Sequence, residues 1–265
     1  MVIISKNTSS TDTLIAFLKR ANILNFERYE EEGFHQVTII NQTYKFIFIH
    51  IPKNAGTTIT KVLSDHTQWQ DLELGGTIYG ESIAPAYVKR FGIGKHTRAE
   101  VVRNVVGEHV WDKCFKFAFV RDPFARTLST YQFLLKWRNW ANSEIMDHFE
   151  NFESFVTSRF FNEEPGPDGI FLPQWNWVCD ANGSLLLDQI YKVENIDHDI
   201  RTLAAKIPLK LSEESTPKMN ESEKLEKNQI FFSNVAANVI QKKYAPDFVK
   251  FGYKPSLPNL VFSQT

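Results

Sequence analysis

Residues Lys45–Thr58 read KFIFIHIPKNAGTT. The first half, Phe46–Ile51, is largely apolar and rich in β-branched and aromatic side chains, which is typical of a short buried parallel strand. Pro52 has no amide proton for a strand ladder, so we expect the strand to end there. A compact loop follows. Beyond it, side chains recur at helical spacing: Ile59, Val62, Leu63 and His66.

A strand, a tight loop and a helix in this order form an architecture that binds phosphate. The first amides of a helix lack intrahelical partners, and the helix dipole favours an anion there. Gly56 would let the backbone approach a ligand, Thr57 and Thr58 add hydroxyls, and Lys53 adds a positive charge. The alternative is an ordinary strand–turn–helix connection that binds nothing.

The loop does not match the phosphate-binding loop of nucleoside triphosphatases. That pattern has two glycines separated by four residues and followed by Lys-Ser/Thr. Here Lys53 precedes Gly56, and the loop has no second glycine. A nucleoside triphosphate and its magnesium would therefore lack their usual ligands.

The bulk properties of the chain are those of one enlarged α/β domain. It has 265 residues, of which 43% are hydrophobic and 14% aromatic, enough for a sizeable core. The net charge of −1 gives no general case for nucleic-acid binding. Two cysteines, Cys114 and Cys179, leave a single disulfide open but exclude a disulfide framework.

The N-terminus lacks the basic start and long apolar core of a signal peptide. No apolar run is long enough to span a bilayer, so we predict no membrane span. If the chain is complete, we expect a cytoplasmic protein.

A second apolar run, Lys116–Val120, ends in Arg121-Asp122-Pro123. Asp122 suits a helix N-cap and Pro123 the first helical position, so Arg121 is expected where a strand ends and a helix begins. Ligands bind at the carboxyl ends of strands in open α/β sheets. The alternative for Arg121 is a salt bridge with Asp122 or another acid. Arg126 lies four residues after Asp122, so we interpret it as structural.

His96 precedes a predicted helix that begins with a capping box formed by Thr97 and Glu100. The positive end of a helix dipole disfavours imidazolium, so a histidine there tends to stay neutral and can accept a proton. The alternative is an ordinary surface histidine at a turn.

A family resemblance enters at these residues. Segment His50–Thr58 resembles the 5′-phosphosulfate loop of the carbohydrate sulfotransferases of sulfotransferase family 2, the Golgi-type branch with heparan sulfate 2-O- and chondroitin sulfotransferases. Asn54 departs from the usual Thr or Cys. Segment Phe119–Ser129 resembles the element that holds the donor's 3′-phosphate through an arginine and a serine eight residues later.

The resemblance implies a soluble member with a three-layer α/β fold of the P-loop type and a mainly parallel central sheet flanked by helices. It implies sulfuryl transfer from 3′-phosphoadenosine 5′-phosphosulfate (PAPS) to a hydroxyl acceptor, with adenosine 3′,5′-bisphosphate (PAP) as product and no metal. Catalysis would fall to Lys53 and to His96 as base. Donor binding would fall to Lys53, Asn54, Ala55, Gly56, Thr57, Thr58, Arg121 and Ser129.

The acceptor is expected to be a glycan or glycolipid, with a small polyol or tyrosyl side chain left open. Trp137–Trp140 is either an acceptor platform or a helix end buried under a loop. Gln174 either faces the acceptor or packs inside the protein. Glu194 is either a second candidate base or a structural cap or buried pair. Thr216 and Lys218 are candidate donor contacts or part of a solvated loop.

We divide the chain into an N-terminal extension, 1–44, with a helix at Thr13–Leu24 and a peripheral strand or hairpin, and a single domain, 45–265. A loop is expected around Gly75–Gly80. Later elements are predicted as a helix at Phe149–Phe161, a strand at Leu187–Val193, and helices at Ile196–Ile207 and Ile230–Tyr244.

Two rival functions remain open from the sequence. An ATP-dependent phosphotransferase on the same fold would need magnesium and an acidic ligand after a strand, for which only Asp122 and Glu194 are placed. A non-catalytic nucleotide-binding module would bind adenosine bisphosphate and turn nothing over. The presence of both Lys53 and His96 argues against such a module.

Overall fold

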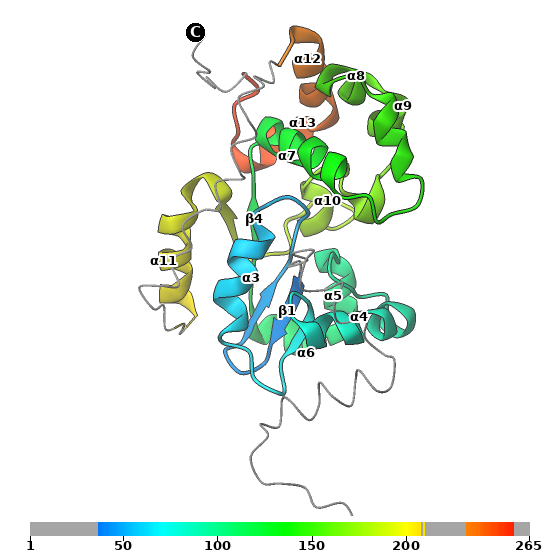
Figure 1. The fold of residues 1–265 in the computed structure, drawn as a ribbon. Coiled ribbons are helices and arrows are strands. Elements are labelled where there is room, and N and C mark those ends of the chain that lie inside the picture. The colour runs from blue at the N-terminus through cyan, green and yellow to red at the C-terminus, as the bar shows by residue number, and fades with distance from the viewer. Residues whose placement is uncertain (1–36, 208, 210–231, 257–265) are drawn as a thin grey trace, which may run out of the picture.

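The computed structural model describes residues 37–207, 209 and 232–256 (Figure 1). The predicted helix at Thr13–Leu24 and the candidate donor contacts Thr216 and Lys218 lie outside the described residues.

Five strands form one mixed sheet in the order β3-β1-β2-β4-β5. Strands β2, β4 and β5 are parallel to one another, whereas β1 is antiparallel to both β2 and β3. The strands are β1 (Val37–Asn41), β2 (Phe46–Phe48), β3 (Leu72–Gly75), β4 (Phe115–Val120) and β5 (Gln189–Lys192). The fold is therefore α/β with a parallel core, as predicted.

Both faces of the parallel core are buried. Alternate residues of β2 and β4 point to opposite faces. Phe46 and Phe117 pack with α3 (Gly56–Ser64) and α11 (Ile196–Lys206), while Ile47 and Ala118 pack with α5 (Ala99–Val106), α6 (Glu108–Lys113) and α10 (Trp175–Val178). Burial on both sides explains the continuous apolar runs that the sequence shows. The sheet and these two groups of helices make three layers, and Figure 1 shows α11 on one flank of the strands and α5, α6 and α4 (Ile78–Phe91) on the other.

The described helices fall into three groups. Those against the sheet and its edge are α3 (Gly56–Ser64), α4 (Ile78–Phe91), α5 (Ala99–Val106), α6 (Glu108–Lys113), α10 (Trp175–Val178) and α11 (Ile196–Lys206). Those of a helical lobe are α7 (Pro123–Lys136), α8 (Phe152–Thr157), α9 (Arg159–Glu163), α12 (Asn234–Lys243) and α13 (Ala245–Phe251). Short 3₁₀ turns are η1 (Ser143–His148), η2 (Pro167–Gly169) and η3 (Val193–Asn195).

The helical lobe has its own aromatic core and stands over the carboxyl end of β4 (Figure 1). Phe155 and Phe171 are fully buried there, with ring centroids 5.7 Å apart. Asp122 caps α7 by accepting hydrogen bonds from the amides of Phe124 (2.9 Å) and Ala125 (3.0 Å), and Pro123 occupies the first turn, as predicted. The lobe therefore starts directly at the strand end where ligands of such sheets bind.

Three local expectations are wrong. The peripheral strand expected before residue 45 is β1, which lies inside the sheet between β3 and β2 with Ile39 and Ile40 buried on opposite faces; the alternative of a hairpin agrees with its antiparallel pairing with β2. Part of the expected loop around Gly75–Gly80 is β3 and the start of α4. The predicted helix at Phe149–Phe161 breaks into α8 and α9 at Ser158, whose extended backbone and side-chain cap on the Phe161 amide restart the helix.

Gly80 lies in the first turn of α4, where that helix packs closely on β3. A Cβ atom on Gly80 would collide with the carbonyl oxygens of Glu73 and Gly75. Only glycine lets the first turn of α4 approach the strand this closely. The glycine therefore lies in a helix that packs on a strand, and it does not mark a loop.

Cys114 and Cys179 are both buried free thiols, so the disulfide that the sequence left open does not form. Among the described residues, none of the helices is both long and apolar enough to traverse a bilayer.

Candidate active site

The loop between β2 and α3 has the geometry of an anion cradle. Lys53 (φ 68°) and Ala55 (φ 56°) both adopt the left-handed conformation, which non-glycine residues take rarely. Ala55 is the N-cap of α3, and no described side chain caps this helix end. A left-handed residue followed by a helical one turns successive amides toward one point, and the first helical amides have no intrahelical partners. The end of α3 is therefore built to receive an anion.

Asn54 faces the protein rather than the cradle. Its side chain is buried, and its Nδ2 atom donates hydrogen bonds to the carbonyl of Phe119 (2.8 Å) and to Oε1 of Gln174 (2.7 Å). Any contact between Asn54 and a donor must therefore come from its backbone. The residue that departs from the family's usual loop ties the cradle to the end of β4.

Gln174 is the partner that the loop and β4 share. Its Oε1 atom accepts a hydrogen bond from the Arg121 amide (2.9 Å), and its Nε2 atom donates to the Arg121 carbonyl (2.8 Å). Its backbone amide donates to Oδ2 of Asp247 (2.8 Å). With the side chain fully buried, Gln174 holds the site from behind, and the alternative that it faces the acceptor is excluded.

His50 explains the glycine of the loop. A Cβ atom on Gly56 would collide with the imidazole ring of His50, which is buried beneath the start of α3. Burial, then the charges of His96 and Lys53, holds the pKa of His50 well below its ordinary value. Gly56 is thus needed for packing against a neutral histidine, a reason different from the close ligand approach that the sequence suggested.

Lys53 lies half-buried at the mouth of the cradle. Its Nζ atom is 3.9 Å from the centroid of the Phe133 ring, within the range of a cation–π contact. Loss of hydration, then the positive charges of Arg121 and Arg126, lowers the pKa of Lys53 to about 8. No carboxylate forms an ion pair with Lys53 among the described residues. A bound anion would supply the missing counter-charge.

His96 is oriented by a backbone carbonyl. Its Nδ1 atom lies 3.2 Å from the carbonyl oxygen of His50, and because a carbonyl only accepts, Nδ1 carries the proton and Nε2 the lone pair. Burial lowers the pKa of His96 to about 4, although the hydrogen bond to His50 and the Asp168 carboxylate partly oppose that shift. The ring is therefore a neutral proton acceptor near pH 7.

The capping box predicted beside His96 does not form. Helix α5 begins at Ala99 with Arg98 as N-cap and no side-chain cap. The hydroxyl of Thr97 instead exchanges hydrogen bonds with the backbone of Gly94, at 2.8 and 3.0 Å. This short turn closes the loop on itself and presents His96 toward β2.

Arg121 lies beside the cradle. Its Nη1 atom donates to the carbonyl of Lys53 at 3.4 Å, and it has no ion pair among the described residues. Asp122 is occupied as the α7 cap, and Glu194 accepts from the Asp122 amide (2.7 Å) and the Tyr253 hydroxyl (2.9 Å). The salt-bridge alternative for Arg121 is therefore not observed, and Glu194 acts as a cap.

Arg126 is structural, as predicted, but through other partners. Its guanidinium is buried and donates to three carbonyls, those of Pro52 (3.1 Å), Leu172 (3.0 Å) and Ile170 (3.0 Å). It makes no ion pair with Asp122. Arg126 thus fixes the start of the cradle to the loop that precedes α10.

Ser129 is half-buried on α7, and its hydroxyl makes no hydrogen bond with another described residue. Thr57 is exposed and Thr58 half-buried at the start of α3. The structure brings Lys53, Arg121 and His96 together around the cradle. The role of Ser129 remains a prediction.

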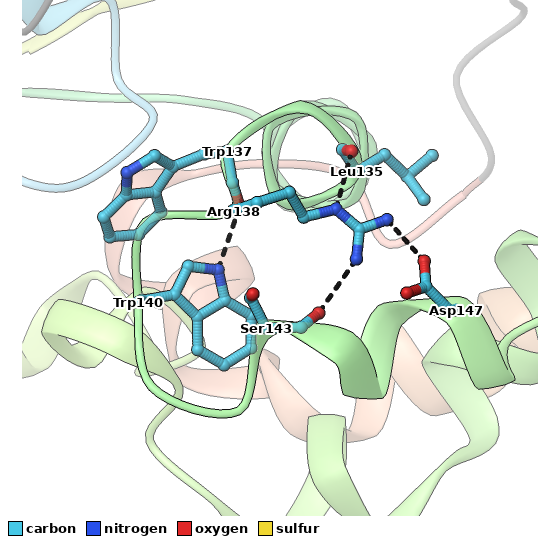
Figure 2. Close-up of polar contacts among 6 residues, drawn as sticks. All are labelled: Leu135, Trp137, Arg138, Trp140, Ser143 and Asp147. Carbon is cyan, nitrogen blue, oxygen red and sulfur yellow. Dashed lines mark hydrogen bonds and ion pairs between the residues drawn. The ribbon is translucent and has the colours of Figure 1, made fainter.

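The segment Trp137–Trp140 divides between two roles. Figure 2 shows the Arg138 guanidinium directed at the carbonyls of Leu135 (3.1 Å) and Ser143 (2.9 Å) and at Asp147 (2.7 Å), away from the Trp137 ring. Trp140 stacks on Phe160, with the two rings 6.0 Å apart. Only Trp137 lines a cavity beside His96. The basic and aromatic platform is therefore mostly a closed helix end.

The roles of three residues that border the site were not predicted from the sequence. His50 begins the segment that resembles the phosphosulfate loop, but its packing beneath Gly56 has no local signal. Phe133 lies in the regular apolar pattern of α7, and Asp168 lies in a loop of ordinary composition. Their roles depend on contacts between segments far apart in the chain, which no local pattern shows.

One family model, described as the sulfotransferase family, matches residues 36–254. No curated protein and no solved structure matches the chain significantly.

Replacing Gly56 with alanine tests the packing of His50 under the cradle. We expect Gly56→Ala to lower the free energy of unfolding by about 1–3 kcal/mol, because the added methyl overpacks the ring. Adding His50→Ala removes the ring that the methyl strikes, so it should recover part of that loss. The backbone carbonyl of residue 50, which holds His96, is kept. Urea unfolding of the wild type, both single variants and the double variant measures the coupling. Purely additive losses would show that the two residues do not meet.

The low pKa of Lys53 predicts how pH affects anion binding. A bound anion favours the protonated amine, so affinity for PAP should fall as pH rises above about 8, and binding near pH 9 should take up a proton. Calorimetry in two buffers of different ionisation enthalpy measures that uptake. Lys53→Arg keeps its charge at high pH and should abolish it. Equal uptake in wild type and Lys53→Arg would assign the proton to another group.

Proposed function

The chain belongs to the sulfotransferase family, and we propose that it transfers the sulfuryl group of PAPS to a hydroxyl of a carbohydrate acceptor, a glycan or glycolipid. Membership of the family implies the PAPS-dependent reaction. The acceptor and the roles of individual residues are our proposal. The observation that carries it is the meeting of an uncapped helix end, Lys53 and Arg121 with a neutral histidine nearby.

The donor would lie with its phosphosulfate at the start of α3. The amides of residues 55–58, together with the hydroxyls of Thr57 and Thr58, suit its oxygen atoms. Arg121 and Ser129 would bind the 3′-phosphate, for which the planar guanidinium is well matched. Arg121 has no ion pair that competes with this role among the described residues. No metal is needed in this arrangement, because Lys53 and the helix end supply the positive field.

Lys53 would stabilise the departing oxygen. In the transfer, a bond forms between the acceptor oxygen and sulfur while the bond from sulfur to the bridging oxygen of the donor breaks. Negative charge develops on that bridging oxygen and leaves with PAP. A desolvated ammonium with no carboxylate partner stabilises such charge strongly, because it needs little reorganisation.

His96 would take the acceptor's proton. The hydrogen bond from Nδ1 to the His50 carbonyl leaves the lone pair of Nε2 for that proton. A pKa of about 4 makes the free imidazole a weak base. The negative charge of the bound donor should raise that pKa, so the base would strengthen when the donor is in place.

Donor class is tested by calorimetry with PAP, ADP and ATP, each with and without magnesium. We expect metal-independent binding of PAP to be strongest, because only PAP carries a 3′-phosphate for Arg121. Arg121→Ala should weaken PAP about tenfold to a hundredfold, as expected for a lost hydrogen bond to a charged group. ADP affinity should change little.

Arg103→Ala serves as the matched control. Arg103 lies on α5 and forms an exposed ion pair with Glu108, so its removal should leave PAP binding unchanged. Magnesium-dependent preference for ATP would replace the sulfotransferase proposal with a phosphotransferase. PAP binding without any sulfuryl transfer would favour the non-catalytic module.

The proposed base is tested by nuclear magnetic resonance. The pKa of His96, about 4 in the free protein, should rise when PAP saturates the site, because the bound charge favours imidazolium. The His96→Asn spectrum assigns the signal, and that variant should retain PAP binding while losing about a hundredfold or more in sulfuryl transfer. A pKa of His96 that PAP leaves unchanged would place the donor away from this residue.

A further inference from the structure

A small cavity adjoins His96 on the side of the helical lobe. It has a volume of about 50 Å³, and its lining includes Pro52, Lys95, His96, Phe133, Trp137 and Asp168. A space of this size admits a hydroxyl with the carbon that carries it, and the remainder of an acceptor would rest at its mouth. Since Phe133 also contacts Lys53, the cavity opens beside the proposed centre of sulfuryl transfer.

One side of the cavity is aromatic. The rings of Phe133 and Trp137 lie 5.0 Å apart and are tilted by 32°. Aromatic faces are apolar and carry partial negative charge, so they suit the weakly positive C–H groups of a sugar ring. They contribute no charge that would attract an anionic acceptor.

The cations close to the cavity are already paired. Lys95 lines the cavity but forms an ion pair with Glu81 at 2.6 Å. Arg138 adjoins Trp137 in sequence, yet its guanidinium is bound to Asp147 at 2.7 Å (Figure 2). The charge of Lys53 belongs to the proposed donor site. The acceptor side of the centre is therefore not a basic groove.

Asp168 places a carboxylate in this cavity. Asp168 is exposed, and its carboxylate forms no hydrogen bond and no ion pair with other described residues. Its backbone is left-handed (φ 52°), between Gly166 and Gly169, which are left-handed as well. Asparagine and aspartate tolerate that conformation better than most residues, and outliers of this kind gather at functional sites. The carboxylate is near enough to His96 to raise the pKa of its imidazole.

We propose that Asp168 determines acceptor specificity, accepting hydrogen bonds from a neutral hydroxyl-bearing acceptor and turning away acceptors with a carboxylate or sulfate near the reacting hydroxyl. This rests on the proposed sulfotransferase function. A carboxylate accepts hydrogen bonds from neighbouring hydroxyls of an uncharged sugar, whereas a second anion in the same cavity is repelled. The acceptor class is thus an uncharged sugar or its glycoside rather than a polyanionic chain.

The test measures transfer of ³⁵S from labelled PAPS to matched pairs of glycosides. Each pair compares a neutral sugar, such as a glucoside or galactoside, with the corresponding uronic acid or sulfated sugar. We expect the wild type to label neutral members at least about tenfold more than anionic ones. Asp168→Asn keeps the shape and removes the charge, so it should reduce that preference about tenfold or more. Asp168→Lys should reduce it further.

Glu164→Gln is the matched control. It removes one exposed negative charge from the segment before Asp168, at a residue that does not line the cavity, and should leave the preference unchanged. PAP affinity is measured for every variant. A wild-type preference for anionic members, an unchanged preference in Asp168→Asn, or intact PAP binding with no labelling of any neutral member would each overturn the inference. If the wild type does not bind PAP, the proposed function itself is refuted.

Discussion

The fully buried side-chain amide of Gln174 joins the three segments on which the site depends. It exchanges two hydrogen bonds with the backbone of Arg121, accepts one from Asn54, and stands next to Asp247, whose carboxylate receives the Gln174 backbone amide. Asn54, Gln174 and Asp247 are buried, and the Arg121 backbone is partly buried. Leaving one unpaired would cost about 1–3 kcal/mol, so the loop, the end of β4 and α13 hold their positions together. The positions of Lys53 and Arg121 follow from this arrangement.

The charges around the cradle are unbalanced in a way that favours an anion. Arg121 and Arg126 both lower the pKa of Lys53, Arg126 also lowers the pKa of Arg121, and none of the three forms an ion pair among the described residues. Arg126 is satisfied by three carbonyls, which give it hydrogen bonds without cancelling its charge. The protein therefore bears electrostatic repulsion that a phosphosulfate would relieve, and it holds its stabilising groups in place before the donor arrives.

The sequence predicted those parts of the fold that local patterns encode. The apolar runs of β2 and β4, the cap at Asp122 and the helix after Gly56 each rest on a few neighbouring residues, and all were found. The inner position of β1 and the break at Ser158 were missed, since the first depends on strand pairing and the second competes with a continuous helical pattern. At the site, the local sequence around Lys53 and Arg121 was enough to predict both as candidate site residues. The orientation of the Asn54 side chain into the protein was missed, because it depends on a hydrogen bond to Gln174, far along the chain.

The two sides of the proposed transfer centre differ in charge, and that difference constrains what can react there. The donor side carries Lys53 on the loop and Arg121 at the end of β4, and neither forms an ion pair with another described residue, so this side suits a polyanionic nucleotide. On the acceptor side, Lys95 is paired with Glu81 and Asp168 adds a carboxylate to the cavity lining, so the described lining of the cavity favours a neutral acceptor over an anion. His96 lies between the two, with its pKa lowered by burial and by Lys53 and raised by Asp168. In the proposed reaction, a carboxylate on the acceptor side would serve proton transfer as well as selection, because it would support the imidazolium formed when the acceptor hydroxyl loses its proton.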